Sequence, residues 1–201
     1  MPADRVTLPH PHFGGTIFWL KAAVSAGWIA GFLLSPKLWL SSRTYPLTPV
    51  SGLLRPLPAP FDYVVFVALL LLLTWIAIAT RPVRAITALV AVAAAYALFD
   101  QSRWQPWFYQ YLFMLAALGL SYRDEESRRG MLQTCRLIVA AIYFWSGVHK
   151  ANSTFVHDAF PLMVEPLVRW VPEIARGRLL SLGFAAPIAE AAIGLGPILF
   201  T

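Results

Sequence analysis

A short stretch near residue 146 carries groups that could perform acid-base chemistry from one helix face. The spacing i, i+3, i+4 and i+7 would align a phenol, a hydroxyl, a gap and an amine: Tyr143, Ser146, Gly147 and Lys150. An amine at the end of an apolar helix is a candidate base, because desolvation disfavours its charged form. The alternative is an interfacial lysine that snorkels to water and performs no chemistry. Lys150 is therefore the first candidate catalytic residue.

Glu190 is the second candidate, as an acid well inside an apolar run. Acids within membrane helices are functional hypotheses by default. Its helix face carries small residues that would let another helix approach and bring a partner: Gly183, Ala186, Pro187 and Gly194. Lys150 and Arg103 are the expected partners. The alternative is a structural acid that holds this helix against its neighbours.

A third group of candidates alternates polar and indole side chains at a joint between two apolar runs. Asp100 and Arg103 stand at i and i+3 beside the start of a helix, where they could cap it or order the rim of a site with Trp104. The aromatic residues that follow are expected to form an interfacial belt: Trp107, Tyr109 and Tyr111.

The histidines do not predict a metal centre. His149 and His157 are separated across a helix end, His10 and His12 lie near the N-terminus, and no ligand-spaced cluster accompanies them. We expect no metal, and the sequence contains no phosphate loop, dinucleotide fingerprint or nucleophile elbow.

The composition of the chain indicates that these candidate residues belong to a membrane protein. The 201 residues are 58% hydrophobic and 13% charged, with mean hydropathy +0.62, whereas soluble domains are about 45 to 50% apolar and about 25% charged. The sequence therefore predicts an integral membrane protein whose first partner is the lipid bilayer. Basic residues at membrane interfaces account for the net charge of +6, so we expect no nucleic-acid partner.

Six apolar runs have roughly the length that a membrane-spanning helix needs. They predict an all-α, polytopic membrane helical bundle, a single domain over 1–201, with spans 16–35, 61–80, 83–99, 104–122, 131–149 and 179–200. Lys21, in the first run, is expected to snorkel. The charged joint 123–130 is expected to lie in water. Prolines in 151–178 predict short interfacial or re-entrant helices between the fifth and sixth spans.

The arginines favour one orientation in the membrane. A cytoplasmic N-terminus puts most arginines of the short joints inside, against Arg103 alone in the comparable outer joint: Arg81, Arg84, Arg123, Arg128 and Arg129. We predict a multi-pass protein of a bacterial inner membrane, with Lys150 and Trp104 at the exoplasmic face.

Two segments carry a family resemblance. IYFWSGVHKANSTF (142–155) is an aromatic-rich helix that ends in a small-Gly-x-x-Lys step, and FDQSRWQPWFYQYLF (99–113) is a joint with aspartate, tryptophan and tyrosine. Together they resemble vitamin K-dependent gamma-glutamyl carboxylase and its bacterial relatives, the horizontally transferred transmembrane (HTTM) domain family, over roughly 99–160. Lys150 matches the lysine thought to deprotonate reduced vitamin K, and Glu190 more loosely matches an acid of these relatives and of DoxX-like families. At Trp107, where the eukaryotic carboxylase has a histidine, the chain departs from the pattern, so the resemblance does not imply carboxylation.

Two functions follow as hypotheses, and the residue pattern leaves open whether the protein is an enzyme. The first is binding of a quinone or quinol near Lys150, in a pocket formed by Tyr143, Ser146, His149, Asn152, Asp100, Arg103 and Trp104. The second is a non-catalytic membrane subunit or assembly factor of a larger respiratory or photosynthetic complex, which would dock through the small-residue helices 83–99 and 179–200. A transporter is disfavoured, because few ionisable groups lie within the spans and no internal repeat is evident.

Overall fold

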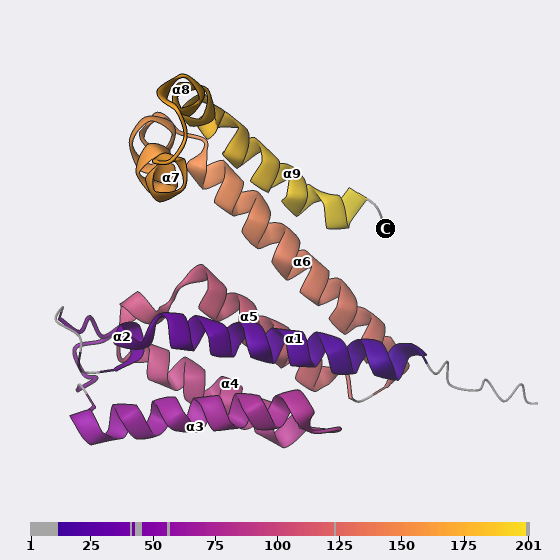
Figure 1. Cartoon of the computed structure of the whole chain (residues 1–201). Coiled ribbons are helices and arrows are strands. Elements are labelled where there is room, and N and C mark those ends of the chain that lie inside the picture. Colours follow the sequence, from indigo (N-terminus) through magenta and orange to yellow (C-terminus); the bar gives the residue numbers. More distant parts are fainter. Residues whose placement is uncertain (1–11, 41, 43–45, 56, 123, 200–201) are drawn as a thin grey trace, which may run out of the picture. The chain divides into compact units, whose positions relative to one another are not determined.

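A computed structural model describes residues 12–40, 42, 46–55, 57–122 and 124–199 (Figure 1). Within these ranges every regular element is a helix, which confirms the predicted all-α class. The chain divides into two compact units, Met1–Met131 and Leu132–Thr201. His10, Arg123 and the end of the last predicted span at 200 lie outside the described residues. The single domain over 1–201 stays a prediction.

The first unit is a four-helix bundle whose helices alternate in direction along the chain. Its long helices are α1 (His12–Leu34), α3 (Ala59–Ile78), α4 (Val83–Leu98) and α5 (Pro106–Leu120). α1 packs on α3 and α5, and α4 packs on the same two helices, so the four form a ring (Figure 1). The short helix α2 (Pro36–Trp39) and the 3-10 turn η1 (Gln101–Arg103) lie at one end of this bundle. The fully buried core is largely aromatic and aliphatic: Trp28, Phe32, Trp39, Leu69, Leu73, Ile86, Leu89, Phe108 and Leu115.

Two glycines of α1 make room for aromatic rings of α5. A Cβ atom on Gly27 would stand 2.6 Å from the Tyr111 hydroxyl oxygen, and one on Gly31 would stand 2.7 Å from the Trp107 ring. Both rings therefore fill the interface between α1 and α5. Glycines more than seventy-five residues earlier in the chain thus give these two half-buried rings a contact surface on α1, and their place in an interfacial aromatic belt stays a prediction.

The second unit is built on the pairing of α6 with α9. α6 (Glu125–Lys150) begins before the unit boundary, and it is followed by a π-helix η2 (Phe155–Ala159), α7 (Phe160–Val168), α8 (Glu173–Ser181), a 3-10 turn η3 (Leu182–Phe184) and α9 (Ala185–Leu199). α9 runs beside α6 in Figure 1. The last predicted run, 179–200, begins inside α8, and the candidate span found in this part of the chain is Ala175–Gly196.

Residues 125–130 of the charged joint are helical, which corrects the predicted start of the fifth helix at 131. α6 begins at Glu125, and a carboxylate oxygen of Asp124 accepts a 2.7 Å hydrogen bond from the Ser127 amide. Glu125 and Glu126 occupy the first turn, where carboxylates are stabilised by the amino end of the helix dipole. These charged residues therefore form the first turns of α6 and do not form a loop between two helices.

Four segments of the described residues are long and apolar enough to cross a membrane: Gly15–Leu34, Pro60–Ile78, Glu125–Lys150 and Ala175–Gly196. α4 has 16 residues and α5 has 15, which at 1.5 Å per residue gives about 24 Å and about 22 Å. Both lengths fall short of the roughly 30 Å hydrocarbon core. The structure thus supports a membrane protein with four candidate spans, where the sequence predicts about six.

Candidate functional site

Close approach of α6 and α9 positions the polar cluster of the second unit. A Cβ on Gly147 would stand 2.5 Å from the Pro187 carbonyl oxygen, and one on Gly194 would stand 2.4 Å from the Phe144 amide nitrogen. Helix axes come this near only where small residues let the backbones touch. At Pro187 and Gly194 the small-residue face predicted around Glu190 is therefore a contact with α6, whereas Gly183 lies in η3 and faces Phe160 and Val156.

Lys150, Glu190 and Ser146 meet in this contact. The Lys150 ammonium donates to both carboxylate oxygens of Glu190, with Nζ 2.8 Å from Oε1 and 2.7 Å from Oε2. The Ser146 hydroxyl donates to Oε1 at 3.0 Å. Of the two partners expected for Glu190, the structure places Lys150 there. The side chains of Lys150 and Glu190 are 33% and 24% exposed, so the ion pair is accessible from one side.

The geometry defines what this cluster can do. Lys150 ends α6, where the carbonyl end of the helix dipole favours a cation, and its Nζ also lies 5.9 Å from the centre of the Phe155 ring. An ammonium held by a carboxylate is a hydrogen-bond donor and must first release its proton before it can act as a base. The Ser146 hydroxyl also fixes one carboxylate oxygen of Glu190. The candidate base predicted from the sequence is thus held in an ion pair with the candidate acid.

Three further residues of the predicted pocket lie on α6 or just beyond it. Tyr143 is 40% exposed on the same helix face as Ser146. The His149 ring stands 6.4 Å from the Trp145 ring, centre to centre. The Asn152 side chain joins two helices: its Nδ2 donates to the His149 carbonyl at 2.6 Å, and its Oδ1 accepts from the Phe155 amide at 2.7 Å. Asn152 therefore acts locally as a helix cap.

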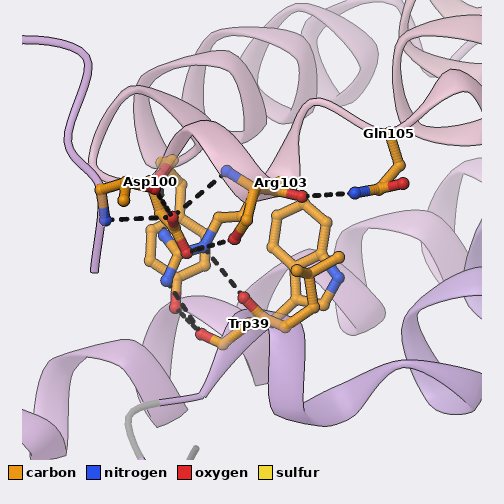
Figure 2. A network of polar contacts seen from close by, with 8 residues as sticks. Trp39, Asp100, Arg103 and Gln105 are labelled. Atoms are coloured by element: carbon orange, nitrogen blue, oxygen red, sulfur yellow. Dashed lines mark hydrogen bonds and ion pairs between the residues drawn. The ribbon is translucent and has the colours of Figure 1, made fainter. Parts of the chain in front are cut away.

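The other predicted cluster, Asp100 with Arg103, lies in the first unit and is sealed from solvent. Asp100 is fully buried and caps η1 (Figure 2), accepting hydrogen bonds from the Ser102 amide at 3.2 Å and the Ser102 hydroxyl at 2.8 Å. It also accepts from the Thr48 hydroxyl at 3.0 Å. Its carboxylate lies 3.8 Å from the Arg103 Nε. The carboxylate thus ties the loop before α3 to the turn after α4.

Arg103 is 4% exposed and donates to backbone carbonyls at the ends of two helices. Its guanidinium reaches the carbonyl oxygens of Leu38 at 3.3 Å and Trp39 at 3.2 Å in α2, and that of Tyr96 at 2.8 Å in the last turn of α4 (Figure 2). It also lies over the Tyr96 ring, 3.9 Å from its centre. The last carbonyls of a helix have no partner within it and carry partial negative charge. Arg103 supplies donors to both ends, which is a structural role.

Trp104 is half-buried beside this network and packs edge-on against Phe108, with ring centres 5.7 Å apart. Gln105 donates to the Ser102 carbonyl at 2.7 Å (Figure 2). The sequence did not single out the partners Trp39, Thr48 and Tyr96 for this cluster. Thr48 and Trp39 lie 52 and 64 positions from the residues they contact, so no local pattern could reveal them.

The predicted site residues thus form two groups, Ser146, Lys150 and Glu190 in the second unit and Asp100 and Arg103 in the first. In the described part of the chain, no group of three or more His, Cys, Asp or Glu side chains could hold a metal ion.

Comparison with known proteins adds no relative: no family model, no curated protein and no solved structure matches the chain. The resemblance to the HTTM family stays a prediction.

Proposed function

We propose that the chain is an integral membrane protein whose α6–α9 contact binds a quinone-like, lipid-soluble molecule at the Lys150–Glu190 pair. The observation that carries this proposal is the partial exposure of the pair, 33% for Lys150 and 24% for Glu190. Both charged groups can therefore be reached from one side of the α6–α9 contact. Here donor and acceptor groups stay within reach of a ligand.

The chemistry of the pair suits both oxidation states of such a ligand. The Lys150 ammonium can donate to the carbonyl oxygen of a quinone, and the Glu190 carboxylate can accept from the hydroxyl of a quinol. Ser146 holds Oε1, so one carboxylate oxygen stays oriented. The resemblance to the gamma-carboxylase membrane core, in which a lysine stands at this step of the motif, supports the same site.

The proposal extends to the membrane arrangement. α4 and α5 would complete six spans as short helices, which a bilayer accommodates by local thinning and by flanking residues. The segment 151–178 would lie at the exoplasmic interface of a bacterial inner membrane, with the N-terminus in the cytoplasm. Fusion of a reporter enzyme after Arg84 and after Ala151 tests this orientation, because the two fusions should report opposite sides.

Extraction in mild detergent followed by quantification of bound quinone tests the binding site. Wild-type protein should retain quinone, and Lys150→Met and Glu190→Gln should each retain less than a tenth as much, because a hydrogen bond to a charged group contributes about 1.5 to 3 kcal/mol. Arg176→Gln is the matched control, since Arg176 forms an exposed ion pair with Glu165 in the same unit. Absence of quinone from the wild type, or equal retention by wild type and Lys150→Met, would contradict the proposal.

A second candidate function, a subunit or assembly factor of a larger membrane complex, is supported by exposed small residues on α4. Ala88 and Ala95 stand two turns apart on this helix and are both exposed, as expected where a partner helix approaches closely. The last helix is a weaker candidate for docking, since Gly194 already contacts α6. Native electrophoresis of gently extracted protein distinguishes this function, because a solitary monomer would contradict it.

A further inference from the structure

A cavity in the first unit is lined by basic side chains and lies at the end of the bundle opposite to Arg103. It measures about 220 Å³ and lies where α3 and α5 end. Three cations and three hydroxyl groups line it, together with Ile17 and Phe18: Lys21, Arg81, Arg128, Thr80, Ser121 and Tyr122. No carboxylate is among these described lining residues. The cavity therefore has the donors and the charge that an anion requires.

Lys21 makes this charge unusual, because it is 1% exposed and is not paired with an acid. Its ammonium donates to the Ala79 carbonyl oxygen at the end of α3 and lies 5.1 Å from the centre of the Phe18 ring. Neither contact neutralises it, and among the described residues no carboxylate pairs with Lys21. A buried charge without a counter-ion is costly. An ammonium has three donors, so donors remain for a ligand in the cavity.

The neighbouring charges do not cancel this potential. Arg81 is exposed, and Arg128 pairs with Glu125 at 3.1 Å through side chains that are 38% and 51% exposed. Such surface pairs contribute little and leave the arginine free to turn toward another anion. The carbonyl ends of α3 and α5 oppose an anion, but Lys21 donates to Ala79 and the Ser121 hydroxyl donates to the Leu118 carbonyl at 2.7 Å. Both helix ends are thus partly satisfied within the protein.

An apolar groove of about 550 Å³ adjoins this cavity and shares Tyr122 with it. The groove lies between α4 and α5. Its walls are mostly aliphatic, and small residues open it: Ala91, Ala116 and Gly119. It extends from Val83 to Ala91, about 12 Å along α4. A charged cavity that continues into an apolar groove matches a molecule with an anionic head and a hydrocarbon chain.

We propose that this combined site binds an anionic phospholipid, with the phosphate between Lys21, Arg81 and Arg128 and one acyl chain in the α4–α5 groove. The phosphate oxygens accept hydrogen bonds from the three cations and from the hydroxyl of Tyr122. On the predicted topology this end of the bundle faces the cytoplasm, where anionic lipids attract basic residues. The site is separate from the Lys150–Glu190 pair, so failure of one proposal leaves the other intact.

Native mass spectrometry of the full chain tests whether the cavity recognises an anionic headgroup. The protein is titrated with phosphatidylglycerol or with phosphatidylcholine of identical acyl chains. Phosphatidylglycerol should bind more tightly, and Arg81→Gln and Arg128→Gln should each weaken its binding about fivefold, since a basic residue near anionic lipid contributes about 1 kcal/mol. Arg84→Gln is the matched control, because Arg84 is exposed, stands three residues after Arg81 and does not line the cavity. Equal affinity for the two lipids, or equal weakening by Arg84→Gln, would overturn the proposal.

A larger side chain in the groove tests whether the groove holds an acyl chain. Competition by inorganic phosphate tests whether the ligand is a lipid or a free phosphate. Ala91→Leu should weaken phosphatidylglycerol binding, whereas Ala88→Leu, on an exposed part of α4 outside the groove, should not. Inorganic phosphate should not displace the lipid at millimolar concentration. Displacement of the lipid by inorganic phosphate, or lipid binding unaffected by Ala91→Leu, would indicate a site for a small phosphate ligand. Either result would overturn the proposal.

Discussion

Gly147→Ala should separate α6 from α9 and weaken the Lys150–Glu190 pair. The added Cβ would stand 2.5 Å from the Pro187 carbonyl oxygen and 2.6 Å from the Ala191 amide nitrogen. Ordinary contacts begin at 3.4 Å, and both neighbours are backbone atoms that cannot rotate away. α9 must therefore retreat by about 1 Å. Because Ala191 follows Glu190, this retreat also moves the carboxylate.

Two opposing effects determine how much Gly147→Ala changes the free energy of unfolding. Overpacking costs about 1 to 3 kcal/mol, and a clash with backbone atoms falls in the upper part of that range. Alanine gains about 1 kcal/mol over glycine in a helix. Gly147→Ala should thus lower the free energy of unfolding by about 1 to 2 kcal/mol. A retreat of that size would also lengthen the Lys150–Glu190 contacts, now 2.7 and 2.8 Å, beyond the usual range of a hydrogen bond.

Reversible unfolding in mixed micelles measures this change, with bound quinone as a second readout. Gly130→Ala in α6 and Gly196→Ala in α9 are matched controls, because a Cβ at either position meets nothing within 4 Å. Both controls should be as stable as the wild type or more stable, by up to about 1 kcal/mol. If Gly147→Ala were as stable as Gly196→Ala, the close contact of the two helices would be refuted, whatever the outcome for quinone.

Three other substitutions separate structural from functional charges. Arg103→Met should lower the free energy of unfolding by about 3 to 5 kcal/mol, because it leaves Asp100 buried without its cation; chemical denaturation would show this, and a loss below 1 kcal/mol would contradict the capping role. Lys150→Met should destabilise by about 1 to 3 kcal/mol, and the double variant with Glu190→Met should recover most of that loss; a double variant less stable than the single one would contradict the pairing. Arg176→Gln should change stability by less than about 1 kcal/mol, since its ion pair is exposed; a larger loss in a thermal melt would contradict this.

The positions of the long helices could be predicted because each depends on local composition. The apolar run that ends at His149 corresponds to a helix that ends at Lys150, and the run that begins at 83 corresponds to α4. Proline at the first turn of α5 is also a local signal. Charge misled the prediction at 123–130, because acidic residues are as favourable in the first turn of a helix as in a loop.

Contacts between distant segments could be predicted only where the residue types on one helix face indicated a close neighbour. Lys21 appears in the sequence as a lone cation in an apolar run, which suggests snorkelling. In the structure it is buried and donates to a carbonyl 58 residues away. Arg103 likewise depends on carbonyls of α2, and every residue has a carbonyl, so residue type gives no signal. A cation that binds backbone therefore cannot be assigned its partner from sequence.

The pairing of Glu190 with Lys150 was predictable for the opposite reason. A carboxylate within an apolar helix needs a cation, and the small residues beside Glu190 specify a neighbour that approaches very closely. Lys150 satisfies this requirement, because its own helix carries Gly147 one turn earlier on the same face. Arg103 does not, since its guanidinium is already engaged by α2 and α4. Complementary glycines on two helices thus identify the contact that brings the charges together, and substitution at those glycines is the most direct way to separate the pair without removing either charge.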